Sequence, residues 1–600
     1  MGRRLSALPL ALFVFAACAS PPPPPPPPPA APPPPAALPP PAPSAEPSTA
    51  APPEPSDWPH QHPLVVRGTG GMVVTDNAAA TVVGRNVLAS GGNAADAAVA
   101  VAFTLAVTYP TAGNLGGGGF AVARIGGEVR ALDFRETAPA AAKPARYLGP
   151  DGKAKPDVRE GIRSAGVPGS VAGLYELYQK LGSKRKSWAA LLAPAIQLAE
   201  AGFVVDKPFV ASLEFARARL SKHPASAALF LPNGAPPPIG SIWKNPDLAA
   251  TLRRIEQGPT GFYEGPTAAA VVAQMKRDGG FITLADLKKY RAKWREPLRF
   301  SYRGHEIVSM PPPSSGGVTM AMIAHILERY ELRKLGFQTP ASLHYLFEAM
   351  RRAYAARNAK LGDPDFVKMP LDELLSPAWA DAESATIQPD RATPSSEIVA
   401  APASASGPHT TNFCVVDANG DAVSLTTTVN WWFGSGVTVA GAGFVLNNEM
   451  DDFAAVPGVP NGFGLVQGEA NAIAPGKRML SSMSPTLVFA PSGELRLVAG
   501  GAGGPTIIST VFQEISNVLD FGLDVGAAVA APRFHMQHLP DEVLYEEHGL
   551  PPKLRASLEA MGYSFRERPH IADAPAIGRL GREWLGAAEP RRAGALAEAP

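Results

Sequence analysis

The sequence predicts a layered α/β (α+β) fold whose sheets are mostly antiparallel. Strands followed by helices recur in both halves of the chain, which is typical of stacked sheet and helix layers. Two expected strands, "TNFCVVD" (411–417) and "AVSLTTTVN" (422–430), are joined by "ANGD", and an Asn-Gly turn favours a tight antiparallel hairpin. The run 91–110 is apolar on every side, as expected of a buried helix.

The composition sets the broad class of the protein. At 600 residues the chain is too long for one simple core, so we expect several domains or one large composite domain. Its 54 basic and 53 acidic residues nearly balance, without a long basic stripe, which argues against nucleic acid as a partner. The two cysteines, Cys18 and Cys414, exclude a disulfide framework.

Residues 1–18 predict a secretory signal, because Arg3 and Arg4 precede an apolar run too short to span a bilayer. The run ends in "FAAC", which resembles a bacterial lipoprotein signal, so Cys18 is the expected lipidation site. Residues 19–62 follow as a Pro/Ala-rich linker that cannot bury a core. We therefore expect a periplasmic or outer-membrane lipoprotein of the bacterial envelope. The alternative is a soluble periplasmic or secreted protein.

The folded elements are then expected in order. "GTGGMVVTDN" (68–77) is a short strand, the buried helix of 91–110 follows, and 111–139 supply a glycine-rich loop and two apolar strands. Residues 169–360 are expected to be mainly helical and 364–409 to be loop-rich. After the hairpin, we expect three more strands and a helix. They are "GFVLNN" (443–448), "SPTLVFA" (484–490), "LRLVAGG" (495–501) and the helix "TIISTVFQEISNVLDFG" (506–522).

Thr410 and Thr411 stand where a Pro/Ala/Ser tract meets the first strand of the hairpin. A threonine hydroxyl is a weak nucleophile unless a base lies beside it, and an N-terminal threonine carries that base as its own α-amine. A free α-amine titrates near pH ~8, which suits a general base at neutral pH. Two threonines before a strand are also explained by β propensity alone.

The surrounding motifs decide between these interpretations. "TTNFCVVDANGDAVSLTTTVNWWFGSG", "GFVLNNEMDDF", "KRMLSSMSPT" and "GGAGGPT" closely resemble the small subunit of γ-glutamyltransferases (γ-glutamyl transpeptidases, glutathione hydrolases). The earlier "GGNAADAAVAVAFTLAV", "NLGGGGF", "DFRETAP" and "MPPPSSGG" resemble the large subunit. The resemblance covers about residues 64–600. It implies an N-terminal nucleophile hydrolase, a four-layer αββα sandwich formed from two autoproteolytic subunits.

The resemblance also implies how the chain is divided. Cleavage of the His409–Thr410 bond would separate a large subunit, 63–409, from a small catalytic subunit, 410–600, and the two would form a heterodimer. The freed Thr410 would be both nucleophile and base. The other implied catalytic groups are the Thr428 hydroxyl, which supports the nucleophile, and the backbone N–H groups of Gly503 and Gly504, which form an oxyanion hole.

The implied substrate site binds both charged groups of a γ-glutamyl head. An arginine, an amide and two hydroxyls would bind the α-carboxylate, because a planar guanidinium matches a carboxylate. Two acidic residues would bind the α-ammonium, and an aromatic lid would cover the site. In that order, the residues are Arg135, Asn430, Ser481 and Ser482, then Glu449 and Asp452, then Phe463.

A few positions depart from the family pattern. Phe463 stands where the lid tyrosine is common, so the hydrogen bond of that tyrosine to Asn430 is expected to be lost. The bulky side chains after Asn430 are expected to narrow the site. The remaining departures lie in the strands and the loop of the hairpin: Asn412 for a histidine, Cys414 for a serine, and Trp431 and Trp432.

The resemblance implies transfer of the γ-glutamyl group of glutathione, or of another γ-glutamyl compound, to water, an amino acid or a peptide. The intermediate would be a γ-glutamyl-Thr410 ester, and no cofactor or metal is implied. One alternative is a cephalosporin (glutaryl) acylase or a poly-γ-glutamate depolymerase on the same scaffold. Another is a surface lipoprotein that keeps the fold without catalysis. The complete clamp for ammonium and carboxylate favours the transferase, and the histidines of "HMQH" (535–538) are expected to be structural.

Overall fold

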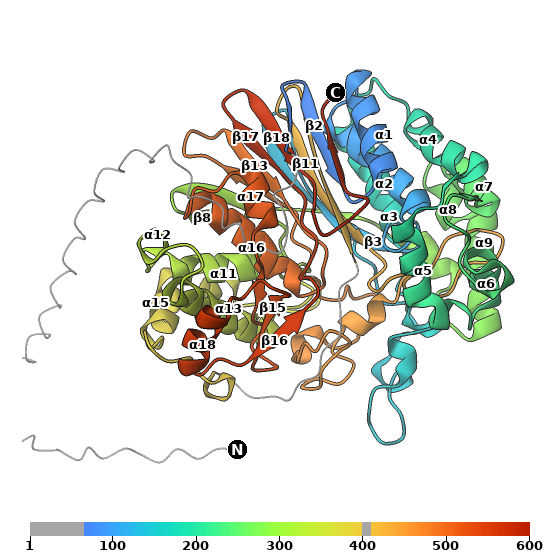
Figure 1. The fold of residues 1–600 in the computed structure, drawn as a ribbon. Helices are drawn as coiled ribbons and strands as arrows, with labels where there is room; N and C mark the ends of the chain where they lie inside the picture. The colour runs from blue at the N-terminus through green and yellow to red at the C-terminus, as the bar shows by residue number, and fades with distance from the viewer. Residues whose placement is uncertain (1–64, 399–409) are drawn as a thin grey trace, which may run out of the picture. The chain divides into compact units, whose positions relative to one another are not determined.

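The structure, a computed structural model, describes residues 65–398 and 410–600 (Figure 1). The predicted signal with Cys18, the linker 19–62 and His409 lie outside the described residues. Both described segments belong to one compact unit, so the two expected subunits share a single folded body.

Two seven-stranded sheets form the centre of the described fold, and the pairings within them are antiparallel. The first sheet contains, in spatial order, β1 (Val66–Gly68), β18 (Glu583–Ala587), β17 (Ala576–Leu580), β13 (Leu495–Ala499), β12 (Thr486–Phe489), β9 (His305–Ser309) and β8 (Leu298–Tyr302). The second contains β19 (Leu596–Glu598), β2 (Gly71–Thr75), β10 (Thr411–Asp417), β11 (Ala422–Thr428), β3 (Gly118–Ile125), β4 (Glu128–Asp133) and β7 (Lys293–Arg295). Each sheet therefore contains strands from both sides of residue 410.

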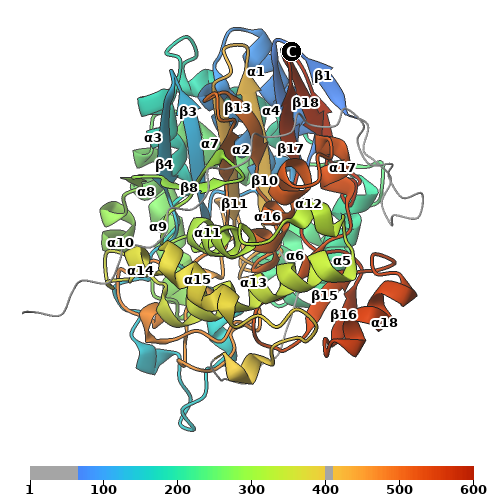
Figure 2. The same cartoon turned by 90° about the vertical axis from the view of Figure 1, so that its left-hand side faces the viewer.

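Helices cover the outer faces of both sheets, which gives the expected four-layer αββα order. Figure 1 shows α1 (Ala78–Ala89), α2 (Ala94–Thr108) and α3 (Ser170–Leu181) on one side, and α11 (Gly316–Leu327), α16 (Thr506–Leu519) and α17 (Val525–Ala530) on the other. Figure 2 shows α13 (Pro340–Lys360) and α15 (Pro377–Ala385) on the outer side of α11. The remaining helices are α4 (Trp188–Ala201), α5 (Lys207–Leu220), α6 (Pro224–Phe230), α7 (Pro246–Ile255), α8 (Thr260–Tyr263), α9 (Gly265–Asp278), α10 (Leu284–Lys289), α12 (Leu332–Leu335), α14 (Leu371–Leu374) and α18 (Pro552–Ala560).

Two smaller sheets complete the described fold. The three-stranded sheet contains β14 (Phe534–His535), β15 (Val543–Glu546) and β16 (Phe565–Arg568), and β15 and β16 run parallel. The two-stranded sheet contains β5 (Phe203–Val204) and β6 (Ile242–Trp243).

The predicted central hairpin is confirmed as β10 and β11. Thr411 pairs with Thr427, and Val416 pairs with Ala422. Gly420 has a φ of 76°, a left-handed conformation that glycine adopts without a steric penalty. The predicted all-apolar helix is confirmed as α2, in which every residue is buried.

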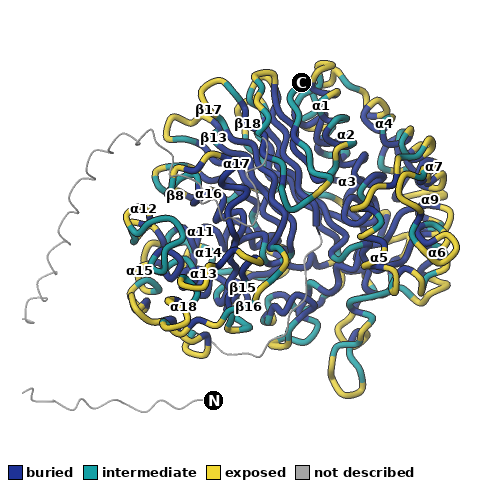
Figure 3. Tube along the Cα trace, in the orientation of Figure 1, coloured by how far each residue is buried: buried dark blue, intermediate teal, exposed yellow. Residues whose placement is uncertain are grey.

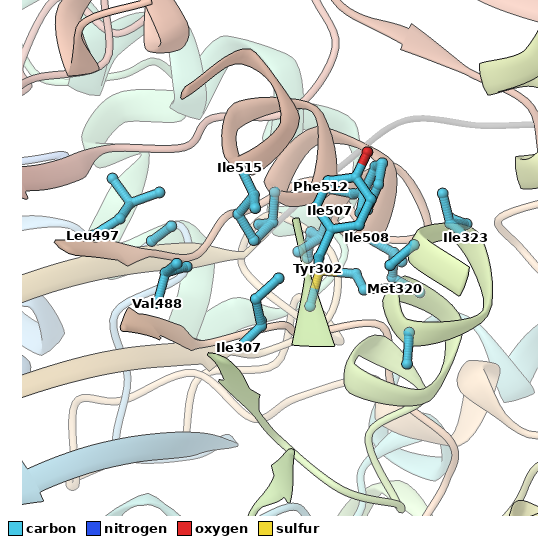
Figure 4. Close-up of a cluster of buried hydrophobic side chains, with 14 of the residues drawn as sticks. Tyr302, Ile307, Met320, Ile323, Val488, Leu497, Ile507, Ile508, Phe512 and Ile515 are labelled. Atoms are coloured by element: carbon cyan, nitrogen blue, oxygen red, sulfur yellow. The ribbon is translucent and has the colours of Figure 1, made fainter. Parts of the chain in front are cut away.

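Alternation along β10 divides the hydrophobic core into two layers. Phe413 and Val415 pack in the layer that contains α1, α2 and α4, whereas Cys414 and Val416 face the first sheet. On the far side of that first sheet, α11 packs against β9 and α16 against β13, and Figure 4 shows Ile307, Val488 and Ile515 in one apolar cluster there. Figure 3 shows that both sheets are buried along most of their length.

The structure corrects one expectation, the strand at 443–448, and adds detail to two others. The mainly helical stretch 169–360 also contains the β8–β9 hairpin, whose turn residues Arg303 and Gly304 both have positive φ. Residues 443–448 are not a strand, because only isolated bridges such as Gly116 with Leu446 form there. The loop-rich stretch 364–409 contains the helices α14 and α15.

Candidate active site

Thr410 is buried and lies directly before β10, which is an inner strand of the second sheet. Its Oγ1 lies 3.5 Å from the Oγ1 of Thr428, at the end of the neighbouring strand β11. The Asn430 backbone N–H donates to that same Thr428 oxygen over 2.7 Å. The hairpin register therefore places the two predicted catalytic threonines side by side.

A glycine pair lies at the start of α16, in the loop that borders the same pocket. Gly503 and Gly504 have φ values of 156° and 59°. A Cβ at Gly504 would lie 2.8 Å from Phe463, so a side chain has no room there. Neither glycine N–H donates a hydrogen bond to another described residue. Two unused N–H groups near a helix N-terminus form a favourable site for a developing negative charge.

The opposite wall of the pocket carries the predicted acidic pair around a buried arginine. Arg135 Nη1 lies 2.6 Å from Glu449 Oε2, and Arg135 Nη2 pairs with Asp452. Glu136, next along the chain, approaches Nη1 to 3.6 Å. Both Glu449 oxygens are buried without an aligned hydrogen bond in the described part of the chain. On this wall, Arg135 is thus the direct ion-pair partner of three carboxyl groups.

The three carboxyl groups outnumber Arg135 on this wall, so a further cation is favoured there. Burial raises the pKa of Glu449 well above its usual range and raises that of Asp452, although Arg135 opposes both shifts. Burial likewise raises the pKa of Glu136 to about 8. Burial also opposes the charge of Arg135, but attraction to Glu449, Asp452 and Glu136 outweighs it and raises the Arg135 pKa. An ammonium group bound here would allow the carboxyl groups to ionise together.

The serine pair is held by a polar network that the sequence analysis did not find. Arg357 of α13 is buried, and its Nη2 donates to Ser482 Oγ over 3.2 Å. Its Nε donates to Ser315 Oγ over 3.1 Å, and the Ser315 hydroxyl in turn donates to the carbonyl of Ser481. Gln467 accepts from Arg357 and donates to the backbone oxygen of Asp452. Arg357 therefore connects the serine pair to the acidic wall.

The predicted lid residue Phe463 packs over the glycine pair. Its ring is in edge contact with Trp431, with centroids 6.4 Å apart. Asn430 donates through its side chain to the Asn448 carbonyl over 3.0 Å, and Trp431 N–H donates to Asn448 Oδ1. An aromatic contact with Trp431 thus connects Phe463 to this loop without a tyrosine hydroxyl.

The other residues that depart from the family pattern lie in different parts of the structure. Cys414 is buried between the sheets, and burial raises the pKa of its thiol strongly, so it is a core residue. Asn412 is buried two residues nearer the start of β10. Trp432 borders a second cavity beside the site. His535 is buried with both ring nitrogens hydrogen-bonded, to Ser509 and Gln537.

Two features are absent from residues 65–398 and 410–600. Within those segments, no group of His, Cys, Asp or Glu side chains is arranged to hold a metal ion. In the same segments, none of the helices combines the length and apolar character needed to cross a bilayer.

Comparison with known proteins agrees with this geometry. The sequence model of the gamma-glutamyltranspeptidase family matches residues 80–599. The chain is 45% identical over 546 residues to a glutathione hydrolase proenzyme of Pseudomonas sp. (strain A14), covering 89% of this chain and 94% of that protein. It is 43% identical to the glutathione hydrolase proenzyme of Escherichia coli (strain K12), covering 88% of this chain and 91% of that protein.

A solved structure of a protein named for a different activity shares the fold at lower identity. The cephalosporin acylase of Bacillus halodurans superimposes with a TM-score of 0.77 and 26% identity, covering 91% of this chain and 99% of that one. The fold is therefore common to both activities, and the site residues must separate them.

Proposed function

The chain belongs to the gamma-glutamyltranspeptidase family, and we propose that it is a γ-glutamyltransferase and glutathione hydrolase with Thr410 as its N-terminal nucleophile. The observation that carries this proposal is one pocket that contains both threonines and the clamp. Thr410 and Thr428 share it with Arg135, Glu449 and Asp452. No cofactor enters the proposed reaction.

The proposed reaction begins with the α-amine of Thr410, freed by cleavage after His409. This amine accepts the hydroxyl proton as the Thr410 oxygen attacks the γ-carbonyl carbon of the donor. The carbonyl oxygen becomes negatively charged and is stabilised by the N–H groups of Gly503 and Gly504. The C–N bond then breaks, the amine returns the proton to the leaving nitrogen, and a γ-glutamyl-Thr410 ester remains. Water or an amine attacks this ester in the reverse sequence and frees Thr410.

The charged wall explains the choice of a glutamyl group. The α-ammonium of the donor adds a second positive charge beside Glu449 and Asp452, which otherwise share Arg135, and the α-carboxylate is bound by Arg135, Ser481 and Ser482. Asn430 and Phe463 border the same pocket. A glutaryl group has no ammonium and would leave the buried carboxyl groups of Glu136, Glu449 and Asp452 with Arg135 as their shared ion-pair partner.

A pair of matched anilides tests the proposal against the acylase alternative. Sites that hydrogen-bond a specific substrate group reject analogues lacking it by up to ~10⁴–10⁵. We expect the mature protein to prefer a γ-glutamyl anilide over the glutaryl anilide by roughly 10³ in kcat/KM, a discounted use of that range. Asp452→Asn should reduce this preference mainly by slowing the glutamyl substrate. Comparable rates on the two anilides with wild-type protein would favour the acylase.

We further propose that Cys18 carries a lipid and that residues 19–62 act as a spacer between the membrane and the enzyme. The support is the "FAAC" ending of the signal and the Pro/Ala-rich composition that follows. Cys18→Ser should move the protein from the detergent-extracted membrane fraction to the soluble envelope fraction. Wild-type protein that is already soluble without detergent would instead indicate simple secretion.

A further inference from the structure

A second cavity, of about 330 Å³, opens beside the Thr410 pocket. Phe463 and Pro505 line both spaces, and the glycine pair divides between them, with Gly503 facing the second cavity and Gly504 the first. A carbonyl held at this glycine pair, with its γ-glutamyl side in the first pocket, directs its leaving group into the second cavity. The size is suitable for a small ligand.

One wall of the second cavity is a face of the three-stranded sheet. His535, Leu544 and Arg566 occupy neighbouring positions on β14, β15 and β16, because His535 pairs with Leu544 and Leu544 with Arg566. Arg568 lies two residues after Arg566, so both side chains point to the same face. Two arginines therefore project side by side into the cavity that receives the leaving group.

Of these two arginines, Arg566 has an ion-pair partner among the described residues and Arg568 has none. Arg566 forms an ion pair with Glu542. Arg568, which is half-buried, forms no ion pair and no side-chain hydrogen bond with any residue in 65–398 or 410–600. Arg592, a third arginine of the cavity, is bound to Asp573 over 2.6 Å and 2.7 Å. Arg568 is thus an unpaired cation beside a like charge, and an anion bound there would relieve the repulsion.

We propose that Arg568 binds a peptide carboxylate, so that the second cavity selects leaving groups and acceptors with a free C-terminal carboxylate. This inference rests on the proposed γ-glutamyl transfer at Thr410. Arginine binds carboxylates through two parallel hydrogen bonds, which suits a terminal carboxylate. An extended dipeptide spans about 7 Å, so the carboxylate of glutathione's leaving dipeptide lies beyond the glycine pair. Leu544, Ile571 and Pro540 supply an apolar surface for its side chains.

Kinetics with glutathione and its C-terminal amide test the subsite. The two donors share the γ-glutamyl group and differ only in the charge of the leaving dipeptide. Loss of a charged hydrogen bond at a partly exposed site predicts that wild-type protein prefers glutathione roughly tenfold in kcat/KM. Arg568→Gln should remove this preference by slowing glutathione alone. Arg582→Gln, which removes an exposed arginine on the β17–β18 turn, should leave the ratio unchanged.

The possible outcomes distinguish failure of the proposed subsite from failure of the proposed function. Equal kcat/KM of wild-type protein on the two donors would overturn the subsite while leaving γ-glutamyl transfer intact. An Arg568→Gln protein that loses activity on both donors to the same extent would also overturn it. Failure of wild-type protein to cleave any γ-glutamyl donor would overturn the proposed function, and the subsite with it. Because the wild-type ratio needs no variant, the test holds even if Arg568→Gln does not fold.

Discussion

Arg357 is buried beside Thr410 with only neutral hydrogen-bond partners. Its guanidinium donates to Ser315, Asn358, Gln467 and Ser482. Burial lowers its pKa to about 10, and attraction to Tyr354 and Asp452 opposes that shift. A buried cation without a direct carboxylate partner is costly unless a ligand compensates it. We therefore infer that Arg357 positions Ser482 and strengthens the field that attracts the substrate carboxylate.

Replacing Arg357 by Met should raise KM for a γ-glutamyl anilide more than it lowers kcat. Hydrogen bonds to charged groups contribute about 1.5–3 kcal/mol, which predicts a roughly 10- to 150-fold loss in kcat/KM. Steady-state kinetics on the mature protein measure both constants. Arg357→Lys should recover part of the loss, because it retains the charge.

Lys360 on the same helix provides the control for this effect. It pairs with Glu373 over 2.8 Å and does not border the pocket, so Lys360→Met should leave KM unchanged. An Arg357→Met protein with normal KM and lowered thermal stability would show that Arg357 is only a structural residue.

At the scale of elements, the start of β10 is fixed by an acid on the neighbouring strand. Asp76 directly follows β2, and its Oδ2 accepts a hydrogen bond from Thr411 Oγ1 over 2.8 Å. Its other oxygen has no hydrogen-bond partner within the described residues. Burial, followed by repulsion from Asp573, raises the pKa of Asp76 to about 7, from an ordinary value near 3.8. The folded protein thus retains a proton that the unfolded chain releases.

This difference predicts how stability depends on pH. Between about pH 4 and 7 the folded state binds the extra proton, so the free energy of unfolding falls as the pH rises. Each pKa unit corresponds to about 1.4 kcal/mol, so the loss is on the order of a few kcal/mol. Asp76→Asn retains an acceptor for Thr411 and cannot ionise, so it should flatten the profile.

Thermal unfolding at pH 5 and pH 8, in the uncleaved Thr410→Ala background, measures this change. We expect Asp76→Asn to raise Tm at pH 8 relative to its parent by more than it does at pH 5. An equal change in Tm at both pH values would show that Asp76 does not cause the pH dependence of stability.

Elements with local signals were predictable, and those defined by distant contacts were not. The β10–β11 hairpin has an Asn-Gly turn, and α2 is apolar on every side. The β8–β9 hairpin was missed, because its "RG" turn lacks the Asn, Asp or Gly that favours a positive φ at the first turn position. No local pattern places β9 beside β12, which is far away in the sequence. From the sequence alone, Arg357 is expected on the exposed side of a helix. In the structure it is buried, because α11 and the loop that contains Ser481 cover it.

At the scale of the whole molecule, the two predicted subunits cannot be separate domains. The segment before residue 399 supplies β1, β8 and β9 to the first sheet and β2, β3, β4 and β7 to the second. The segment after 409 supplies the central strands β12 and β13 of the first sheet and β10 and β11 of the second. Separating them would expose the apolar core between the two sheets to water, which costs free energy.

We therefore expect self-cleavage before Thr410 to leave a complex that stays together. Wild-type protein should give two bands on a denaturing gel, the smaller starting at Thr410 and containing 191 residues. Native gel filtration should show one peak that contains both fragments, because antiparallel pairing of β10 with β2 joins them at the sheet centre. Thr410→Ala should remain one chain and be inactive, since it lacks the attacking hydroxyl. Two bands from purified Thr410→Ala would contradict self-cleavage. Fragments of wild-type protein that separate without denaturant would contradict the shared core.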